Sequence, residues 1–187
     1  MCGRFLFSDE LECPEVRRFC ALADEQFSKD GWSRGEVTPG ALYPVFVKGE
    51  NKAVLQLMTW GYGRTDGRLL INARAESIEG KRTFASDFQY RRCAVLVTGF
   101  FEWGKDEDRT KFLFRSEEPC MYLGAIHNTE GNYTILTTEA NSSVRGIHHR
   151  MPLIIPGNKL LIWLRDIHAA REILTERMPL LTVYAAE

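Results

Sequence analysis

Residues 93–104 read Cys-Ala-Val-Leu-Val-Thr-Gly-Phe-Phe-Glu-Trp-Gly. The first six are apolar or β-branched, which is typical of a buried strand, and a glycine follows them. Five further short segments have the same character: Leu42 to Val47, Val54 to Trp60, Lys111 to Arg115, Met121 to Ile126 and Tyr133 to Thr138. Because Gly and polar clusters separate these segments, they predict strands in a mostly antiparallel arrangement.

Helical periodicity is confined to three segments. Pro14 to Gln26 places apolar residues at helical spacing and has a proline suited to the first turn. Lys159 to Leu164 and Ile167 to Leu174 predict short C-terminal helices. Many strands with few helices, not alternating one for one, indicate the α+β class. The 187 residues suit a single domain spanning 1–187, although periodicity does not show whether the strands close into a barrel.

Composition predicts a soluble globular protein, with 44% apolar and 26% charged residues. No stretch approaches the ~18 consecutive apolar residues that a membrane span needs, so no membrane partner is expected. The five cysteines are odd in number and include no C-x-x-C pair. A zinc site or a disulfide framework is therefore not expected, and reduced thiols in the cytoplasm are the better interpretation.

Charge is unevenly distributed along the chain, although the net charge is only −1. From Arg64 to Arg92 there are seven basic residues against four acidic ones. A nearly neutral protein can still present one basic face to phosphates. Composition alone nevertheless favours the alternative, in which these are scattered solvated side chains.

Cys2 is the first candidate for chemistry. Methionine aminopeptidases remove Met1 when the next side chain is small, and Cys2 would then carry both an α-amine and a thiol, with ordinary pKa values of about 8 and about 8.5. Both groups are partly nucleophilic at neutral pH. Such an aminothiol condenses with an aldehyde to an imine and then closes a thiazolidine ring. The alternative is that Cys2 has no chemical role and packs as a small apolar side chain. Its position in the sequence alone does not decide between these two interpretations.

Two strand ends carry further candidates. Asn72 and Arg74 follow the apolar residues 69–71, where an amide and a guanidinium can orient a substrate and hold a phosphate. Taken alone, this segment fits a turn with a surface salt bridge better. Glu102 lies among three aromatic residues, and an inward-facing carboxylate there would have its pKa raised toward the range of general acid–base catalysis. Pointing outward, it would be an ordinary surface residue.

The segment 148–152, His-His-Arg-Met-Pro, supplies an imidazole that can shuttle a proton near neutral pH. If the segment is extended, His149 points to the side opposite His148. A single histidine is more often structural than catalytic. Two histidines without a nearby third ligand do not make a metal site, so no metal is expected.

Five ordered motifs together are more specific than any one alone: Met1-Cys2-Gly3-Arg4, Trp60-Gly61, Asn72-Ala73-Arg74-Ala75-Glu76, Arg91-Arg92-Cys93 leading to Gly99-Phe100-Phe101-Glu102-Trp103, and His148-His149-Arg150-Met151-Pro152. In this order they resemble the SOS response-associated peptidase (SRAP) family, also described as the abasic-site DNA–protein crosslinking family. The resemblance runs from Cys2 to about Leu164.

The resemblance implies a mostly antiparallel, barrel-like sheet with a few flanking helices and a DNA-binding channel. It also implies covalent capture of abasic sites in single-stranded DNA, with no cofactor. By the family pattern, Cys2 forms the thiazolidine link, Asn72 and Glu102 line the site, and His148 is the catalytic histidine.

The resemblance further implies which residues contact DNA. Arg4, Arg74 and Arg150 are expected to contact phosphates or the active site, and Trp60 and Trp103 to offer surfaces for a neighbouring base. Two departures stand out. Many relatives carry an Asn where this chain has Glu36 and a Tyr where it has Phe101.

We therefore predict a monomeric cytoplasmic enzyme, associated with the nucleoid when bound to DNA, that shields abasic sites during the DNA-damage response. The strongest alternative is a thiol peptidase in which Cys2 attacks a peptide carbonyl, such as the Met1–Cys2 bond of its own chain. A third alternative is a reader that binds the lesion reversibly. No replication-fork partner can be named from the sequence.

Overall fold

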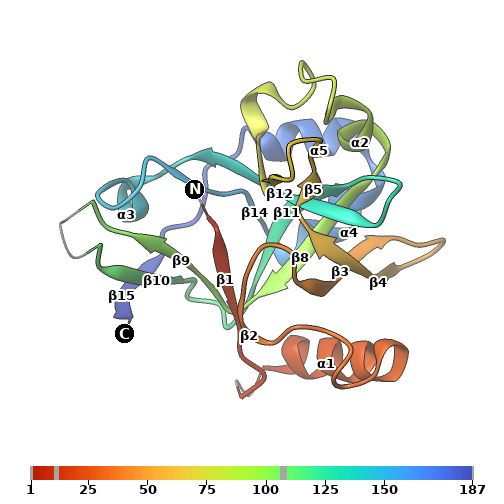
Figure 1. Ribbon diagram of the computed structural model, residues 1–187, viewed down its shortest axis with the longest axis horizontal. Helices are drawn as coiled ribbons and strands as arrows, with labels where there is room; N and C mark the ends of the chain where they lie inside the picture. The colour runs from red at the N-terminus through yellow and green to blue at the C-terminus, as the bar shows by residue number, and fades with distance from the viewer. Residues whose placement is uncertain (1, 11–12, 106–108, 187) are drawn as a thin grey trace.

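The computed structural model describes residues 2–10, 13–105 and 109–186 and is built around two large sheets (Figure 1). The larger sheet follows the order β13, β12, β4, β3, β8, β11 and β14, with β7 attached to β12. The bounds are β3 (Leu42–Lys48), β4 (Ala53–Trp60), β7 (Asn72–Arg74), β8 (Arg92–Val97), β11 (Met121–His127), β12 (Asn132–Glu139), β13 (Arg150–Pro152) and β14 (Ile154–Ile155).

Pairing in the larger sheet returns to its starting strand. β12 pairs with β4 at one side and with β11 at the other, so β12, β4, β3, β8 and β11 form a ring. The pairs are antiparallel except where β12 runs parallel to β4 and to β7. The predicted α+β class and barrel-like sheet are therefore confirmed. The parallel pairing of Asn72 with Ile135 fixes Asn72 beside the ring.

The second sheet brings the beginning of the chain to the strand that carries Glu102. It follows the order β15 (Thr182–Ala186), β10 (Lys111–Arg115), β9 (Gly99–Trp103), β1 (Arg4–Phe7) and β2 (Gly35–Val37), all antiparallel. In the β1–β9 pair, Arg4 lies opposite Phe101 and Leu6 opposite Gly99. Gly99 is required there, because an added Cβ would lie 2.9 Å from the Phe114 carbonyl oxygen of β10.

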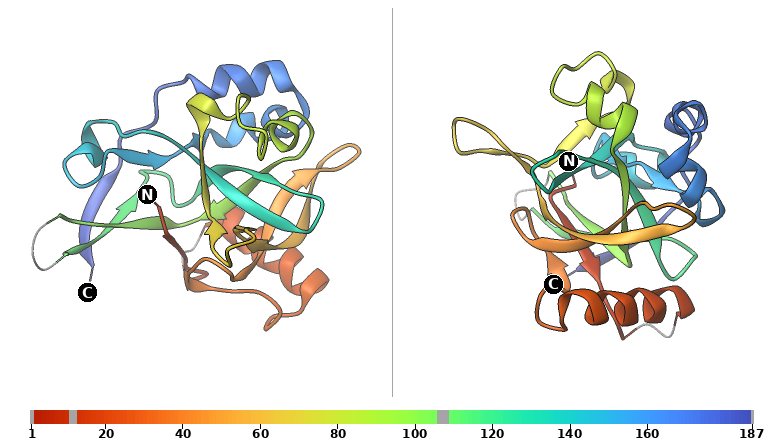
Figure 2. Two further views of the ribbon diagram at one scale, coloured as in Figure 1. Left: turned by 45° about the horizontal axis from the view of Figure 1, so that its top comes forward. Right: turned by 90° about the vertical axis from the view of Figure 1, so that its right-hand side faces the viewer.

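An aromatic cluster holds the far end of β1 in place. Phe7 packs against Phe19 and Trp32 at centroid distances of 5.2 and 5.4 Å, and Tyr43 joins them from β3. Phe19 comes from α1 (Pro14–Phe27), which lies along one side of the molecule (Figure 2). Removing a buried aromatic ring of this kind costs about 3–5 kcal/mol. The cluster therefore anchors β1 as it runs from Cys2 into the core.

The remaining helices are short: α2 (Ala85–Tyr90), α3 (Ser142–Arg145), α4 (Leu160–Arg165) and α5 (Ile167–Leu174), with 3-10 turns at Ala75–Ser77 and Gly157–Lys159 and a small hairpin of β5 (Tyr62–Gly63) with β6 (Leu69–Leu70). Asp166 caps α5 by accepting from the backbone N–H of His168 at 2.7 Å. No helix in the described part of the chain is long and apolar enough to cross a membrane.

All six predicted strands and all three predicted helices are confirmed within about two residues. The sequence patterns did not predict β1, β2, β5, β9, β13, β14 and β15, nor the helices α2 and α3.

Candidate active site and nucleic-acid interface

Cys2 begins the segment that enters β1 and is fully buried. Its thiol donates to the Arg4 carbonyl oxygen, with a sulfur–oxygen distance of 3.5 Å. Burial raises the pKa of the Cys2 thiol, and the negative charge of Glu102 raises it further. The thiol is therefore protonated at neutral pH, and Glu102 lies close enough to act on it electrostatically.

Asn72 holds the backbone of Cys2. Its Nδ2 donates to the Cys2 carbonyl oxygen at 2.8 Å, across 70 positions of sequence. The Asn72 Oδ1 atom is buried, and no donor among the described residues hydrogen-bonds to it. A buried acceptor without a donor is costly, so this oxygen is available to a polar group that enters the site.

The Glu102 side chain lies on the face of the second sheet that is turned toward the protein interior, and Glu102 is only 3% exposed. Its neighbours on β9, Phe101 and Trp103, lie on the other face, because strand side chains alternate. Burial raises the pKa of Glu102. The geometry therefore places this side chain inward, with a pKa shifted toward the range in which a carboxyl group can exchange protons with a neighbour.

His148 lies in the turn between α3 and β13. His148 Nδ1 lies 3.0 Å from the Arg150 backbone nitrogen and 3.1 Å from the Arg150 carbonyl oxygen, so the Arg150 backbone holds this side of the ring. Burial lowers the pKa of His148, while its contact with the Arg150 backbone carbonyl opposes that effect. The ring is therefore mostly neutral at pH 7.

His149 does not point away from His148 as an extended segment would require. The two rings stack with centroids 4.5 Å apart. The condition of the prediction, an extended segment, is not met, because the backbone N–H of His148 donates to the Val144 carbonyl at 2.9 Å and the chain turns ahead of these two residues.

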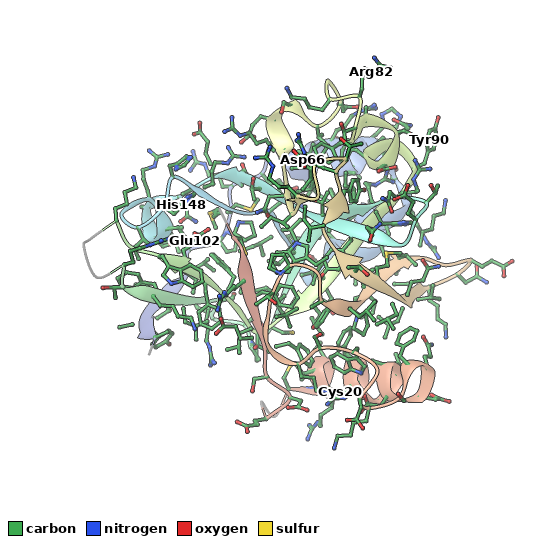
Figure 3. All side chains as sticks on the ribbon, in the orientation of Figure 1. Cys20, Asp66, Arg82, Tyr90, Glu102 and His148 are labelled. Carbon is green, nitrogen blue, oxygen red and sulfur yellow. The ribbon has the colours of Figure 1, made fainter. Side chains whose placement is uncertain are left out.

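Four segments distant in sequence meet around the start of the chain: the entry to β1, β7, β9 and the turn before β13. The start of β1 lies beside this turn in each ribbon view (Figures 1 and 2). Figure 3 shows Glu102 and His148 on the same side of the molecule. The structure thus gathers Cys2, Asn72, Glu102 and His148 in one region.

Tyr133 is a neighbour of this region that the sequence patterns did not single out. It is fully buried, its hydroxyl has no hydrogen-bond partner among the described residues, and its ring stacks on Trp60 at 6.3 Å. Burial raises its pKa, with smaller contributions from Cys93 and Cys2. The sequence patterns placed Tyr133 at the start of an apolar, β-branched strand and gave no functional signal for it.

Arg4 lies on the outer face of the second sheet, beside Trp103. Its guanidinium is 5.4 Å from the Trp103 ring centroid, and it forms an ion pair with Glu36. The same carboxylate accepts from Lys111 Nζ at 2.5 Å, and that ammonium lies 4.3 Å from the Phe101 ring centroid. Glu36 therefore neutralises two cations at once. The sequence did not identify Lys111, because the pair joins strands that are far apart along the chain.

A second group of cations lines a shallow hollow next to Asn72. The hollow has a volume of ≈ 440 Å³ and is lined by Asn72, Arg74, Lys81, Phe84 and neighbouring residues. Arg74 and Lys81 are exposed, and neither forms an ion pair with any described residue. These two side chains are free to meet phosphates.

Two of the predicted DNA contacts lie in the interior. Arg150 is 7% exposed and forms a bidentate pair with Glu76, with both N–O distances 2.8 Å. Trp60 is fully buried and donates from Nε1 to the Ile71 carbonyl at 3.0 Å. In this conformation Trp60 has no face for a base and Arg150 no free fork for a phosphate, because both hold segments of the protein together.

No three His, Cys, Asp or Glu side chains within residues 2–10, 13–105 and 109–186 lie close enough together to hold a metal ion.

The family model described as SOS response associated peptidase (SRAP) matches residues 1–186. The chain belongs to this family. The abasic site processing protein YedK of Escherichia coli (strain K12) is 29% identical over 190 residues, covering 92% of this chain and 83% of that protein. The abasic site processing protein YoaM of Bacillus subtilis (strain 168) is 28% identical over 185 residues, covering 88% and 79%.

Solved structures share the fold of this SRAP protein. A crystal structure of a protein from Bacteroides thetaiotaomicron superposes with a TM-score of 0.79 at 21% identity, covering 100% of this chain and 92% of that one. One from Bordetella bronchiseptica gives 0.75 at 16% identity, covering both chains completely.

Proposed function

We propose that this protein captures abasic sites in single-stranded DNA covalently, through the amine and thiol of Cys2 after Met1 is removed. The observation that carries the proposal is the meeting of Cys2, held by the Asn72 amide, with the buried carboxylate of Glu102. Met1 itself lies outside the described residues. Relatives named abasic site processing proteins support the choice of substrate.

Binding would use two cationic regions near this centre. Arg74 and Lys81 line the hollow beside Asn72, and Arg4 lies against the half-buried Trp103 ring. Cations follow the phosphates and an aromatic ring offers a surface to a base, a combination typical of sequence-independent single-strand binding. A single strand also exposes the sugar, which an intact duplex does not.

The reaction begins with opening of the abasic sugar to its aldehyde. We assign this proton transfer to His148, whose ring is mostly neutral at pH 7 and whose Nδ1 is held by the Arg150 backbone. The neutral α-amine of Cys2 then attacks C1′ and gives a carbinolamine. Asn72 Oδ1, buried and without a donor, would accept a hydrogen bond from this intermediate.

Loss of water from the carbinolamine gives the imine, and addition of the Cys2 sulfur closes the thiazolidine. Glu102 protonates the departing hydroxyl and takes the thiol proton, as its raised pKa permits. The raised pKa of the Cys2 thiol means that the thiolate forms only as the ring closes. Overall, one aldehyde and one aminothiol give one thiazolidine and one water.

A thiol peptidase is the second candidate, because the matching family is described as a peptidase and the entry to β1, which begins at Cys2, lies beside the turn before β13, which carries His148. In that reaction the sulfur alone attacks a carbonyl, and a free α-amine at Cys2 is not needed.

One experiment separates the two candidates. Protein that begins at Cys2 by intact mass is mixed with single-stranded DNA carrying one abasic site and run on a denaturing gel, alongside protein acetylated at its N-terminus. Covalent capture predicts a heat-stable band that acetylation abolishes and Cys2→Ala lacks. Equal bands for the free and acetylated proteins would overturn the aminothiol mechanism. Peptide cleavage by the acetylated protein, without a band, would favour the peptidase.

A further inference from the structure

A second pair of sulfur atoms lies outside the Cys2 centre. Cys13 precedes α1 and Cys120 precedes β11, 107 positions away, yet their Sγ atoms are 4.0 Å apart. Both residues are free thiols. Two sulfurs in van der Waals contact need only a small movement to reach the S–S bond length of about 2.05 Å.

The surroundings of the pair differ on its two sides. Cys120 is half-buried and lines a cavity of ≈ 560 Å³, so small solutes can reach its sulfur. Cys13 is 2% exposed, and its thiol donates to a carboxylate oxygen of Glu15 at 3.1 Å. Cys120 is therefore placed to meet an oxidant first, and Cys13 to react second with a proton acceptor at hand.

We propose that Cys13 and Cys120 are an oxidation site, which a peroxide converts to an intramolecular disulfide. The Cys120 sulfur attacks the peroxide oxygen, giving a sulfenic acid and one water from hydrogen peroxide. The Cys13 sulfur then attacks Cys120 Sγ and forms the S–S bond. The Cys13 proton passes through Glu15 to the departing hydroxide, which leaves as a second water.

Oxidation here is slow in the folded protein. Burial, the neighbouring Cys13 and the negative charge of Glu15 together raise the pKa of Cys120 to about 12. Only the thiolate attacks peroxide, so at any pH below that pKa the oxidation rate rises about tenfold when the pH is raised by one unit. The pair therefore stays reduced under ordinary cytoplasmic conditions and responds to strong oxidant.

The disulfide would join the start of α1 to the start of β11. Because it would close a loop of more than a hundred residues, it restricts the unfolded chain and raises the melting temperature. It would also fix one wall of the cavity, whose lining includes Glu15, Cys120 and Tyr122. The chemistry is independent of Cys2 and of the proposed function.

The test uses the full-length protein treated with hydrogen peroxide, blocked with N-ethylmaleimide, digested and mapped by mass spectrometry. A linked Cys13–Cys120 peptide that forms faster at pH 8 than at pH 7 is expected. Cys120→Ser should lose it, while Cys20→Ser, which alters another half-buried cysteine, should keep it. The oxidised wild-type protein should also melt at a higher temperature than the reduced protein, and a reductant should reverse the shift.

Peroxide treatment of the unfolded chain serves as the positive control for oxidation. If that control is oxidised but Cys120 of the folded protein is recovered as a sulfinic acid or as the maleimide adduct, the proposal is overturned. A linked peptide that joins Cys120 to any other cysteine would also overturn it. Because the mapping is done on the wild-type protein, a variant that fails to fold does not remove the test.

Discussion

Replacing Glu36 by glutamine is expected to increase the salt dependence of single-stranded DNA binding. Glu36 accepts from Lys111 Nζ at 2.5 Å and pairs with Arg4, whose side chain is 45% exposed. In the wild-type protein a phosphate must compete with this carboxylate for both cations. Glutamine keeps the size of the side chain and removes its charge, so Arg4 and Lys111 become available to the DNA backbone.

The size of the effect follows from counterion release. Each phosphate neutralised on a single strand contributes about −0.7 to the slope of log K against log salt concentration. One or two released cations therefore steepen the slope by about 0.7 to 1.4. Between 50 and 200 mM salt, this adds a further loss of affinity of about three- to sevenfold, with tighter binding at the low-salt end.

The assay is fluorescence anisotropy of undamaged single-stranded DNA titrated at several salt concentrations, so that no covalent step contributes. Glu176→Gln is the matched control, because Glu176 pairs with Lys159 at 2.5 Å away from the Cys2 region and loses the same charge. A Glu36→Gln slope equal to that of wild type, or a slope that the Glu176→Gln protein reproduces, would refute the competition between Glu36 and phosphate.

Three further predictions concern pH and stability. Burial raises the folded-state pKa of Glu102, so the folded state loses stability as the pH rises from the ordinary Glu range through that pKa. The Glu102→Gln protein should therefore have a higher melting temperature than wild type at pH 7 and the same melting temperature near pH 4. A difference in melting temperature that is equal at the two pH values would contradict this. Burial lowers the pKa of His148, so the ring should stay neutral down to about pH 6.5. The ratio of the wild-type crosslinking rate to the rate of the His148→Asn protein should therefore be constant from about pH 8 to about pH 6.5 and should fall only below about pH 6.5. A ratio that begins to fall above about pH 7 would exclude a neutral His148. Arg150→Ala should cost about 2–3 kcal/mol in urea unfolding, since it breaks the buried fork on Glu76, and should leave the salt slope of DNA binding unchanged; Arg74→Ala should do the reverse.

The sequence predicted the ring strands well because each is a continuous apolar run with clear breaks at its ends. It did not predict β9, whose alternation of a buried Glu102 with aromatic residues gives no simple period. Nor did it predict β15, which is mostly exposed at the edge of a sheet. Pairing between distant strands, such as the parallel contact of β12 with β4, depends on the whole fold and leaves no local pattern.

For the site, the family resemblance selected residues that the structure gathers in one region, although their catalytic roles stay predictions. Resemblance could not tell a side chain that meets DNA from one that supports the site. Trp60 and Arg150 are the examples, because both are buried and hydrogen-bonded within the protein. The coupling of Glu36 to Arg4 and Lys111 was also out of reach, since it depends on how the second sheet is ordered.

The central claim is that both the amine and the thiol of Cys2 join the abasic sugar. The most direct test is to form the crosslink between the mature protein and abasic single-stranded DNA, to digest the protein and the DNA of this product, and to measure the mass of the N-terminal peptide. A thiazolidine predicts the mass of the peptide plus the open sugar minus one water, resistance to borohydride, and no reaction of Cys2 with iodoacetamide. An adduct that gains two hydrogens with borohydride and whose Cys2 thiol is alkylated would be an imine alone, and would contradict the account.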